Sequence, residues 1–199
     1  MKLIKKGLLD TLQGLPSFGL QHEGIPPGGA MDTFSLQIAN ALVGNDLYDK
    51  VLEMHFPAGV YQFETSTLLA ICGADFRACV DNVEVPLNQP IKVPPGAIFS
   101  CKKPVSGQRV YVATRTLHDE QVSRVKILPW SMNPENVFTD EPIRILCGRE
   151  WDQIKACSQQ CFLSRPFGIS PTSNRMGYQL MQEPLKILPS QNLISSAVT

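Results

Sequence analysis

The feature that most constrains the fold is a run of short apolar segments, separated by turn residues, that extends from residue 51 to 113. Residues 60–64 alternate apolar and polar side chains, as a strand with one buried face does, whereas 67–72 is apolar almost throughout. Asp81-Asn82 lies between two segments and is typical of a two-residue hairpin turn. This spacing of short strands and turns predicts an antiparallel β-barrel or β-sandwich.

The same reasoning predicts elements along the whole chain. Two strands are expected on either side of Gly7 within residues 3–13. Further strands are expected at 51–56, 60–64, 67–72, 76–80, 83–85, 91–93, 97–101, 109–113, 125–128, 142–147, 167–170, 177–181 and 185–188. Two short helices are predicted, one over 33–43 and one within 148–162, because apolar residues recur there at helical spacing.

The loop over residues 21–32 differs in character from these strands. Two prolines stiffen its middle, and Gly28 and Gly29 then allow backbone angles that other residues avoid. Asp32 is expected to be the N-cap of the helix over 33–43, and Gly44 its C-terminal stop. Such a loop suits the binding of a small anion, and equally a simple change of chain direction.

Composition excludes several classes of partner. The 199 residues suffice for one large domain or two small ones, and we expect a single domain over 1–199. With 18 basic and 18 acidic residues, the chain shows no charge excess that favours nucleic acid or an anionic membrane. The apolar runs are short, and the N-terminus lacks the features of a signal peptide, so we expect a cytoplasmic protein with no membrane partner.

Neither the cysteine spacing nor any nucleotide-binding motif indicates a cofactor bound by this chain alone. The 6 cysteines lie mostly in apolar runs and are expected to be buried free thiols. They and the 3 separated histidines do not have the spacing of a metal site, so no metal is expected. The chain has no Walker A sequence and no G-x-S-x-G sequence, so motifs support neither ATP binding by this chain alone nor a serine nucleophile.

Three segments together resemble a known family. They are Gly7-Leu8-Leu9-Asp10-Thr11-Leu12-Gln13, the loop over 21–32 with its helix through Asn40 and 42–45, and Ser173-Asn174-Arg175-Met176-Gly177-Tyr178. In combination they are similar to the biotin-dependent carboxyltransferase-like proteins called allophanate hydrolase subunit 2. That family includes the subunit-C proteins of the bacterial ATP-dependent 5-oxoprolinase, to which this chain is most similar, and the KipA-type proteins.

The resemblance implies a mainly β fold, a cyclophilin-like antiparallel barrel with two short helices, that works beside other subunits. In the oxoprolinase, it implies a subunit-B (KipI-like) partner and a subunit-A lactamase partner. The substrate is then a small carboxylate, 5-oxoproline, which becomes glutamate at a shared active site. ATP is the implied cofactor, bound through the complex.

The resemblance leaves two other functions open. One is a non-catalytic KipA-type protein that binds a subunit-B-like partner, and the other is a carboxyltransferase module of a urea carboxylase or allophanate enzyme. Gly28 stands where family members usually have serine, and Asn174 where they usually have aspartate. Such departures favour the non-catalytic alternative.

The resemblance also suggests catalytic residues in the loop. His22 is a candidate general acid or base, with a hydrogen bond to the loop backbone as the alternative role. Asp32 is a candidate catalytic carboxylate, although capping the helix is its first expected role and the two can coexist.

Substrate binding is assigned to Gln21, Gly28, Gly29, Asn40 and Arg175. Asn40 has two alternatives, because its amide could tie the loop to the helix or lie in solvent. Arg175 offers two parallel donors to a carboxylate or phosphate, and its alternative is an ion pair with a nearby acid such as Glu183.

Overall fold

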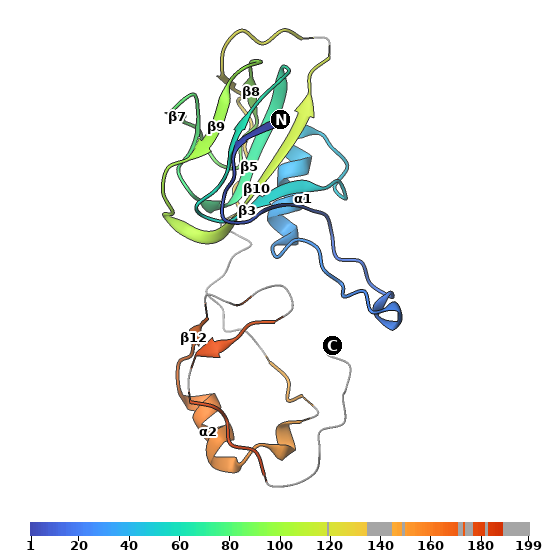
Figure 1. The fold of residues 1–199 in the computed structure, drawn as a ribbon, viewed down its shortest axis with the longest axis vertical. Coiled ribbons are helices and arrows are strands. Elements are labelled where there is room, and N and C mark those ends of the chain that lie inside the picture. Colours follow the sequence, from blue (N-terminus) through green and yellow to red (C-terminus); the bar gives the residue numbers. More distant parts are fainter. Residues whose placement is uncertain are drawn as a thin grey trace. The chain divides into compact units, whose positions relative to one another are not determined.

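The chain forms two compact units, Met1–Phe138 and Thr139–Thr199. The structure, a computed structural model, describes residues 1–118, 120–134, 145–148, 150–170, 173, 177–181 and 183–188, and leaves out the side chain of Gln21 (Figure 1). Whether 1–199 is a single family domain stays a prediction.

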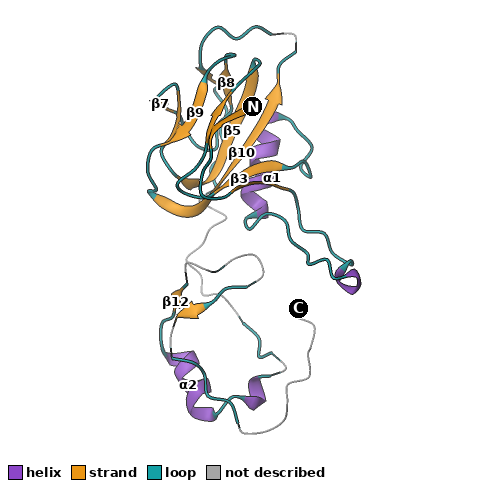
Figure 2. Cartoon of the chain, viewed as in Figure 1, coloured by secondary structure: helices purple, strands orange, loops and turns teal. Residues whose placement is uncertain are grey.

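Strands dominate the first unit, as the sequence predicts (Figure 2). They are β1 (Lys2–Lys5), β2 (Asp10–Gln13), β3 (Val51–Met54), β4 (Val60–Gln62), β5 (Thr67–Asp75), β6 (Ala78–Val80), β7 (Val83–Glu84), β8 (Ile91–Val93), β9 (Ile98–Cys101), β10 (Ser106–Thr116) and β11 (Lys126–Ile127). The helices are η1 (Gln21–Glu23), a single 3-10 turn, and α1 (Thr33–Val43). The predicted bounds of α1 are therefore confirmed.

The strands form two antiparallel sheets. One has the order β1-β4-β9-β6-β7, and the other β11-β8-β5-β10-β3-β2. A single buried apolar cluster joins residues of both sheets, among them Phe63, Phe99, Met54 and Ile71, so the main core lies between the sheets. The turn between β6 and β7 has positive φ at Asp81 (51°) and Asn82 (64°), which confirms the predicted hairpin turn.

The mainly β, antiparallel fold with two helices is confirmed, but over the described residues the two sheets do not close into a complete barrel. Among the described residues, no strand of one sheet pairs with a strand of the other, because β1 pairs with β4 whereas β2 pairs with β3. The chain changes sheet at Gly7, where an added Cβ would clash with the backbone nitrogen of Gly59. The Asp10 carboxylate links the two sheets there, accepting hydrogen bonds from Gly59 N (3.0 Å) and the Tyr61 hydroxyl (3.0 Å).

Helix α1 covers the outer face of the six-stranded sheet (Figure 1). Leu36, Ile38, Ala39 and Val43 are buried against side chains of β3, β5 and β10. The helix ends at Gly44, whose φ of 71° is the left-handed conformation expected of a C-terminal stop. This packing places the N-terminus of α1, and the loop that leads into it, beside β3 and β10.

The second unit contains η2 (Trp151–Gln153), α2 (Ala156–Ser164), β12 (Gly168–Ile169) and β13 (Leu180–Met181). The helix predicted within 148–162 is present as η2 and α2. The strand predicted over 185–188 is reduced to a single bridge between Ile187 and Ile154. Of the strand predicted over 142–147, residues 142–144 lie outside the described part, and 145–147 form no strand.

The described α-helices are short. They contain 11 and 9 residues, and neither has the length and apolar character that a membrane span requires.

Candidate functional site

The loop before α1 lies against the start of the chain through backbone hydrogen bonds. The Ser17 N–H donates to the Pro27 carbonyl (2.9 Å), and the Ala30 N–H donates to the Gly14 carbonyl (2.9 Å). Gly29 has a φ of 82°, and a Cβ on it would lie 2.6 Å from the backbone nitrogen of Pro16. Only glycine fits this close approach of two backbones.

Gly28 is less constrained than its neighbour. Its φ of 58° also lies in the left-handed region, but the nearest atom to an added Cβ is the Pro26 carbonyl oxygen, at 3.7 Å. A serine at residue 28 would therefore be disfavoured by the left-handed backbone conformation, but its side chain would make no close contact with another segment.

Asp32 is the N-cap of α1, as predicted. One carboxylate oxygen accepts from the Ser35 N–H (2.9 Å) and the other from the Ser35 hydroxyl (2.5 Å). Asp32 itself has extended backbone angles, φ −119° and ψ 90°. Because both oxygens are engaged in the cap, the carboxylate adds negative charge at the helix start and competes there with any bound anion.

A row of side chains crosses the six-stranded sheet beneath this loop. The strand register pairs Thr11 with Glu53, Glu53 with Tyr111, and Tyr111 with Cys72. Side chains directly opposite each other across paired strands point to the same face. Tyr111 and Cys72 belong to the apolar cluster under α1, so the row lies on the face that the helix covers.

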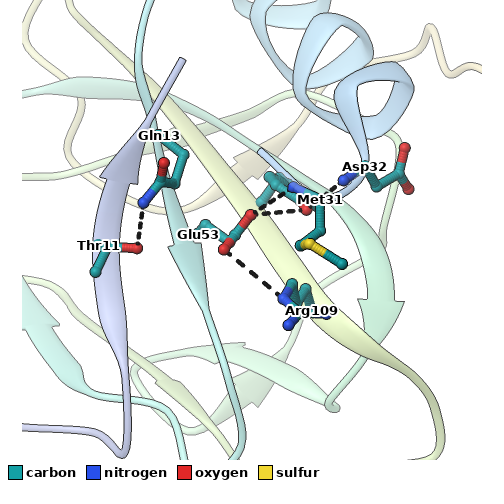
Figure 3. Close-up of polar contacts among 7 residues, drawn as sticks. Thr11, Gln13, Met31, Asp32, Glu53 and Arg109 are labelled. Carbon is teal, nitrogen blue, oxygen red and sulfur yellow. Dashed lines mark hydrogen bonds and ion pairs between the residues drawn. The ribbon is translucent and has the colours of Figure 1, made fainter. Parts of the chain in front are cut away.

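Glu53 and Tyr111 hold the end of the loop in place; Figure 3 shows the contact of Glu53 with Met31. Glu53, a residue that is only 1% exposed, accepts from the Met31 N–H (3.0 Å) and from the Tyr111 hydroxyl (3.0 Å) with the same carboxylate oxygen. The Tyr111 hydroxyl in turn accepts from the Asp32 N–H (2.8 Å). Two consecutive amides at the end of the loop are thus fixed to the sheet.

The Tyr111 hydroxyl stays protonated in this position. Burial is the largest cause that raises the pKa of Tyr111, and the negative charge of Glu53 raises it further, whereas the hydrogen bond from the Asp32 N–H lowers it. A protonated hydroxyl both donates to Glu53 and accepts from Asp32, which a phenolate could not do.

Arg109 is the cation beside this buried acid. Its Nε lies 3.7 Å from a Glu53 oxygen, and 15% of its side chain is exposed. Because unpaired buried charge is costly, Arg109 compensates the charge of Glu53. On the other side of Glu53, Gln13 donates to the Thr11 hydroxyl (2.9 Å) at the sheet edge (Figure 3).

His22 lies apart from this network. Its side chain is 73% exposed in η1, the short helix at the tip of the loop in Figure 2, and its Nε2 lies 3.5 Å from the Glu23 carboxylate. Gln21 also lies in η1, where only its backbone is described. The loop thus separates His22 from Asp32, and the catalytic role predicted for each stays a prediction.

Asn40 is fully buried in α1. Its Nδ2 donates to the Asp49 carbonyl (2.8 Å), and its Oδ1 accepts from Asn45 Nδ2 (3.2 Å). The structure therefore favours the alternative in which Asn40 ties a loop to the helix, although that loop follows the helix rather than precedes it. Substrate binding by Asn40 has no exposed atom to support it.

Arg175 lies outside the described residues, as do its neighbours 174 and 176. Its predicted role toward a carboxylate or phosphate stays a prediction. In this part of the chain the structure describes Ser173, whose hydroxyl accepts from the Gln179 N–H (2.9 Å).

The sequence reasoning missed the roles of Glu53, Tyr111 and Arg109. The one signal available was Glu53, a glutamate inside an apolar strand segment. In a strand with one buried face, such a residue is expected to point toward solvent. All four residues of β3 are buried, because α1 covers the second face of the sheet.

The described residues contain no cluster of His, Cys, Asp or Glu able to hold a metal. All 6 cysteines are free; Cys72 and Cys79 are buried, while Cys147 and Cys157 are exposed. Burial raises the pKa of Cys72 to about 12, so this thiol beneath α1 is a packing residue rather than a nucleophile.

Comparison with known proteins gives the family. The family model of the carboxyltransferase domain, subdomain A and B, matches residues 23–122 and 116–199. The chain belongs to this family. The sequence resemblance to allophanate hydrolase subunit 2 proteins is confirmed.

Individual relatives agree with this assignment. The chain is 29% identical to the 5-oxoprolinase subunit-C protein of Escherichia coli, over 98% of this chain and 73% of that protein. It is 33% identical to urea amidolyase of Saccharomyces cerevisiae over 55% of this chain, which is 6% of that protein. The crystal structure of Kluyveromyces lactis urea amidolyase has the same fold, with a TM-score of 0.70 and 21% identity over 94% of this chain and 14% of that one.

Proposed function

We propose that this chain is the component of a heteromeric, ATP-dependent 5-oxoprolinase that corresponds to the subunit-C proteins. The observation that carries the proposal is the match to the Escherichia coli relative of that kind over 98% of this chain. In this role the chain contributes part of a shared active site at which 5-oxoproline is converted to glutamate. ATP is bound by the assembled complex rather than by this chain alone.

The geometry of the loop supports a place for it in that active site. Glu53 and Tyr111 fix the amides of Met31 and Asp32, and backbone hydrogen bonds from Ser17 to Pro27 and from Ala30 to Gly14 hold the other side of the loop. A backbone held in this way positions substrate precisely, because little freedom remains to be lost on binding.

Exposed apolar side chains near the sheet edges support a partner subunit. Leu12 on β2 is 68% exposed although its cross-strand neighbour Leu52 is buried in the core. Leu8 (69%) and Phe18 (75%) are exposed in the same N-terminal part of the chain. Exposed apolar residues on an edge strand favour association with another chain, and we assign them to the subunit-B-like partner.

Reconstitution tests the proposal. The full chain is mixed with its subunit-A and subunit-B partners and assayed for glutamate released from 5-oxoproline in the presence of ATP. Omission of each protein in turn, and of ATP, should abolish release. Stable assembly without turnover would instead indicate a KipA-type binding protein, and the oxoprolinase proposal would then fail.

A carboxyltransferase module is a second candidate. The match to the carboxyltransferase family and the 33% identity to urea amidolyase favour it. This function requires biotin carried by another protein, and it predicts transfer of labelled carboxyl groups from carboxybiotin to an acceptor. Carboxyl transfer without ATP-dependent glutamate release would favour this function over the first.

A further inference from the structure

Arg109 holds a position that charge compensation alone does not explain. It lies on β10, two residues before Tyr111, with 15% of its side chain exposed. Within the described part of the chain its side chain has one ion pair, at 3.7 Å from Glu53, and its Nε is buried without a hydrogen-bond partner. A guanidinium has five N–H donors, and buried donors are normally satisfied.

Two other arginines form the short hydrogen bond that Arg109 lacks, although the Nε of Arg77 is itself buried without a partner in the described part of the chain. Arg77 is 43% exposed and donates to the Glu84 carboxylate at 2.7 Å. Arg115, on the same strand as Arg109, donates to the Gly44 carbonyl at 2.8 Å. Arg109 is more buried than Arg77 and yet, among the described residues, forms no such bond, so its guanidinium can still donate to an added acceptor.

Glu53 is poorly placed to be that acceptor. An arginine that serves only to neutralise a carboxylate normally forms two short parallel hydrogen bonds with it. Here one Glu53 oxygen accepts from the Met31 N–H and the Tyr111 hydroxyl instead, and the other lies 3.7 Å from Nε. These hydrogen bonds stabilise the carboxylate charge without Arg109, whose donors remain available.

We propose that Arg109 binds the carboxylate of the substrate, with Glu53 as the residue that positions the guanidinium. This rests on the proposed function, in which the substrate is the small carboxylate 5-oxoproline. The planar guanidinium matches a carboxylate with two parallel hydrogen bonds. Asp32, the other acid beside the loop, turns its carboxylate toward Ser35, and the end of the loop lies next to Arg109 (Figure 3).

Direct observation of the guanidinium tests the proposal. In the full-length protein labelled with ¹⁵N-arginine, the Nε–H signal of Arg109 is assigned by comparison with R109K. It is then followed during titration with acetate, inorganic phosphate, 5-oxoproline and 2-pyrrolidinone, the last being the same lactam without a carboxylate. We expect saturable shifts with acetate and 5-oxoproline, weaker shifts with phosphate, and none with 2-pyrrolidinone.

Variants separate binding from folding. R109Q should bind 5-oxoproline about ten- to a hundred-fold more weakly, as loss of a charged hydrogen bond implies, and R109K should fall between R109Q and the unmodified protein. R124Q, which removes an exposed arginine of the same unit, should bind normally. If R109Q does not fold, the titration of the unmodified protein still decides.

The outcomes distinguish the two proposals. Absence of a saturable Arg109 shift with any oxyanion, or unchanged binding by R109Q, overturns the assignment of Arg109. If Arg109 responds to acetate but not to 5-oxoproline, the oxyanion site stands and the proposed substrate fails. If the reconstituted complex containing R109Q keeps its KM for 5-oxoproline, the proposed function stands and the role of Arg109 is overturned.

Discussion

The loop over residues 21–32 has two ends with opposite surroundings. At its start, His22 and Glu23 have side chains that are 73% and 58% exposed and contact each other at 3.5 Å. At its end, the amides of Met31 and Asp32 donate to the almost fully buried Glu53 and to Tyr111, respectively (Figure 3). The same short segment therefore passes from solvent to a fixed position on the sheet.

The difference shows where precise chemistry is possible. A general acid or base must lie within hydrogen-bond reach of the proton it moves, and a side chain in solvent loses conformational entropy when it is held there. At the fixed end that entropy is already lost on folding, through bonds that cross from the loop to β3 and β10. We therefore expect residues 28–32, rather than His22, to carry the functional role of the loop.

Removal of the Glu53 side chain should have the largest effect, because Glu53 holds the fixed end of the loop. E53A leaves the Met31 N–H and the Tyr111 hydroxyl without their shared acceptor and Arg109 without its ion-pair partner, and we expect a loss of about 3–5 kcal/mol in the free energy of unfolding. Urea dependence of hydrogen exchange at β10 amides measures this for the first unit alone. E120Q, which breaks the exposed Lys92–Glu120 pair, should cost less than about 1 kcal/mol.

Loss of less than about 1 kcal/mol in E53A would mean that the end of the loop is held by other contacts. In that case the contrast between the two ends would rest on exposure alone.

Removal of the Tyr111 hydroxyl should have the next largest effect. Y111F leaves the part-buried Asp32 N–H unpaired and removes a hydrogen bond to a carboxylate, which should cost about 2–3 kcal/mol at neutral pH. Because the pKa of Tyr111 is raised above its ordinary value of 10.0, the folded state holds the proton more tightly than the unfolded state. This contribution is complete below pH 10.0 and is lost as the pH rises further.

Urea unfolding of both proteins at a series of alkaline pH values measures this difference. Above pH 10.0 the unmodified protein should lose stability faster than Y111F, since Tyr61, whose pKa burial also raises, is common to both. Parallel pH curves for the two proteins would contradict the role given to the hydroxyl.

The two glycines offer a matched pair of smaller changes. G29A should cost about 2 kcal/mol or more, because the left-handed backbone disfavours alanine and the added Cβ meets the Pro16 backbone at 2.6 Å. G28A should cost only about 1 kcal/mol, from the backbone conformation alone. Thermal midpoints of the two variants, compared with the unmodified protein, measure the difference.

Equal midpoints for G28A and G29A would mean that residues 14–17 move away from the loop at little cost. The loop would then be fixed by Glu53 and Tyr111 alone.

Local patterns predicted the elements of the first unit well. Helix α1 and its two end residues follow from Asp32, the apolar spacing and Gly44, all of which are neighbours in sequence. The hairpin at Asp81-Asn82 is equally local. Propensity and turn chemistry act over a few residues, so a single sequence contains enough information to identify them.

The site depends on pairings that no local pattern specifies. Tyr111 lies 58 residues from Glu53 and 79 from Asp32 along the chain; strand register brings it beside Glu53, and the packing of α1 on the sheet brings Asp32 to it. The open barrel has the same origin, because the change of sheet at Gly7 depends on Gly59 and Asp10 approaching it. In the second unit the strands that the structure describes, β12 and β13, have two residues each, too short for alternation to define them.

Replacement of His22 should have the smallest effect. H22A removes a side chain that is 73% exposed and that, in the described part of the chain, lies against the Glu23 carboxylate alone, so we expect a change within about 0.5 kcal/mol in stability. In the reconstituted complex, we expect glutamate release within about two-fold of the unmodified protein, whereas loss of a general acid or base costs about 10²–10⁴-fold.

E23A is the matched control, since it removes the other half of the same exposed pair. If H22A loses about a hundred-fold or more in turnover while E23A does not, as general acid–base catalysis would require, the exposed end of the loop carries the chemistry. That result would mean that the partner subunits cover η1 in the complex and hold His22 as Glu53 and Tyr111 hold the other end. The contrast between the two ends would then belong to the isolated chain and not to the assembled enzyme.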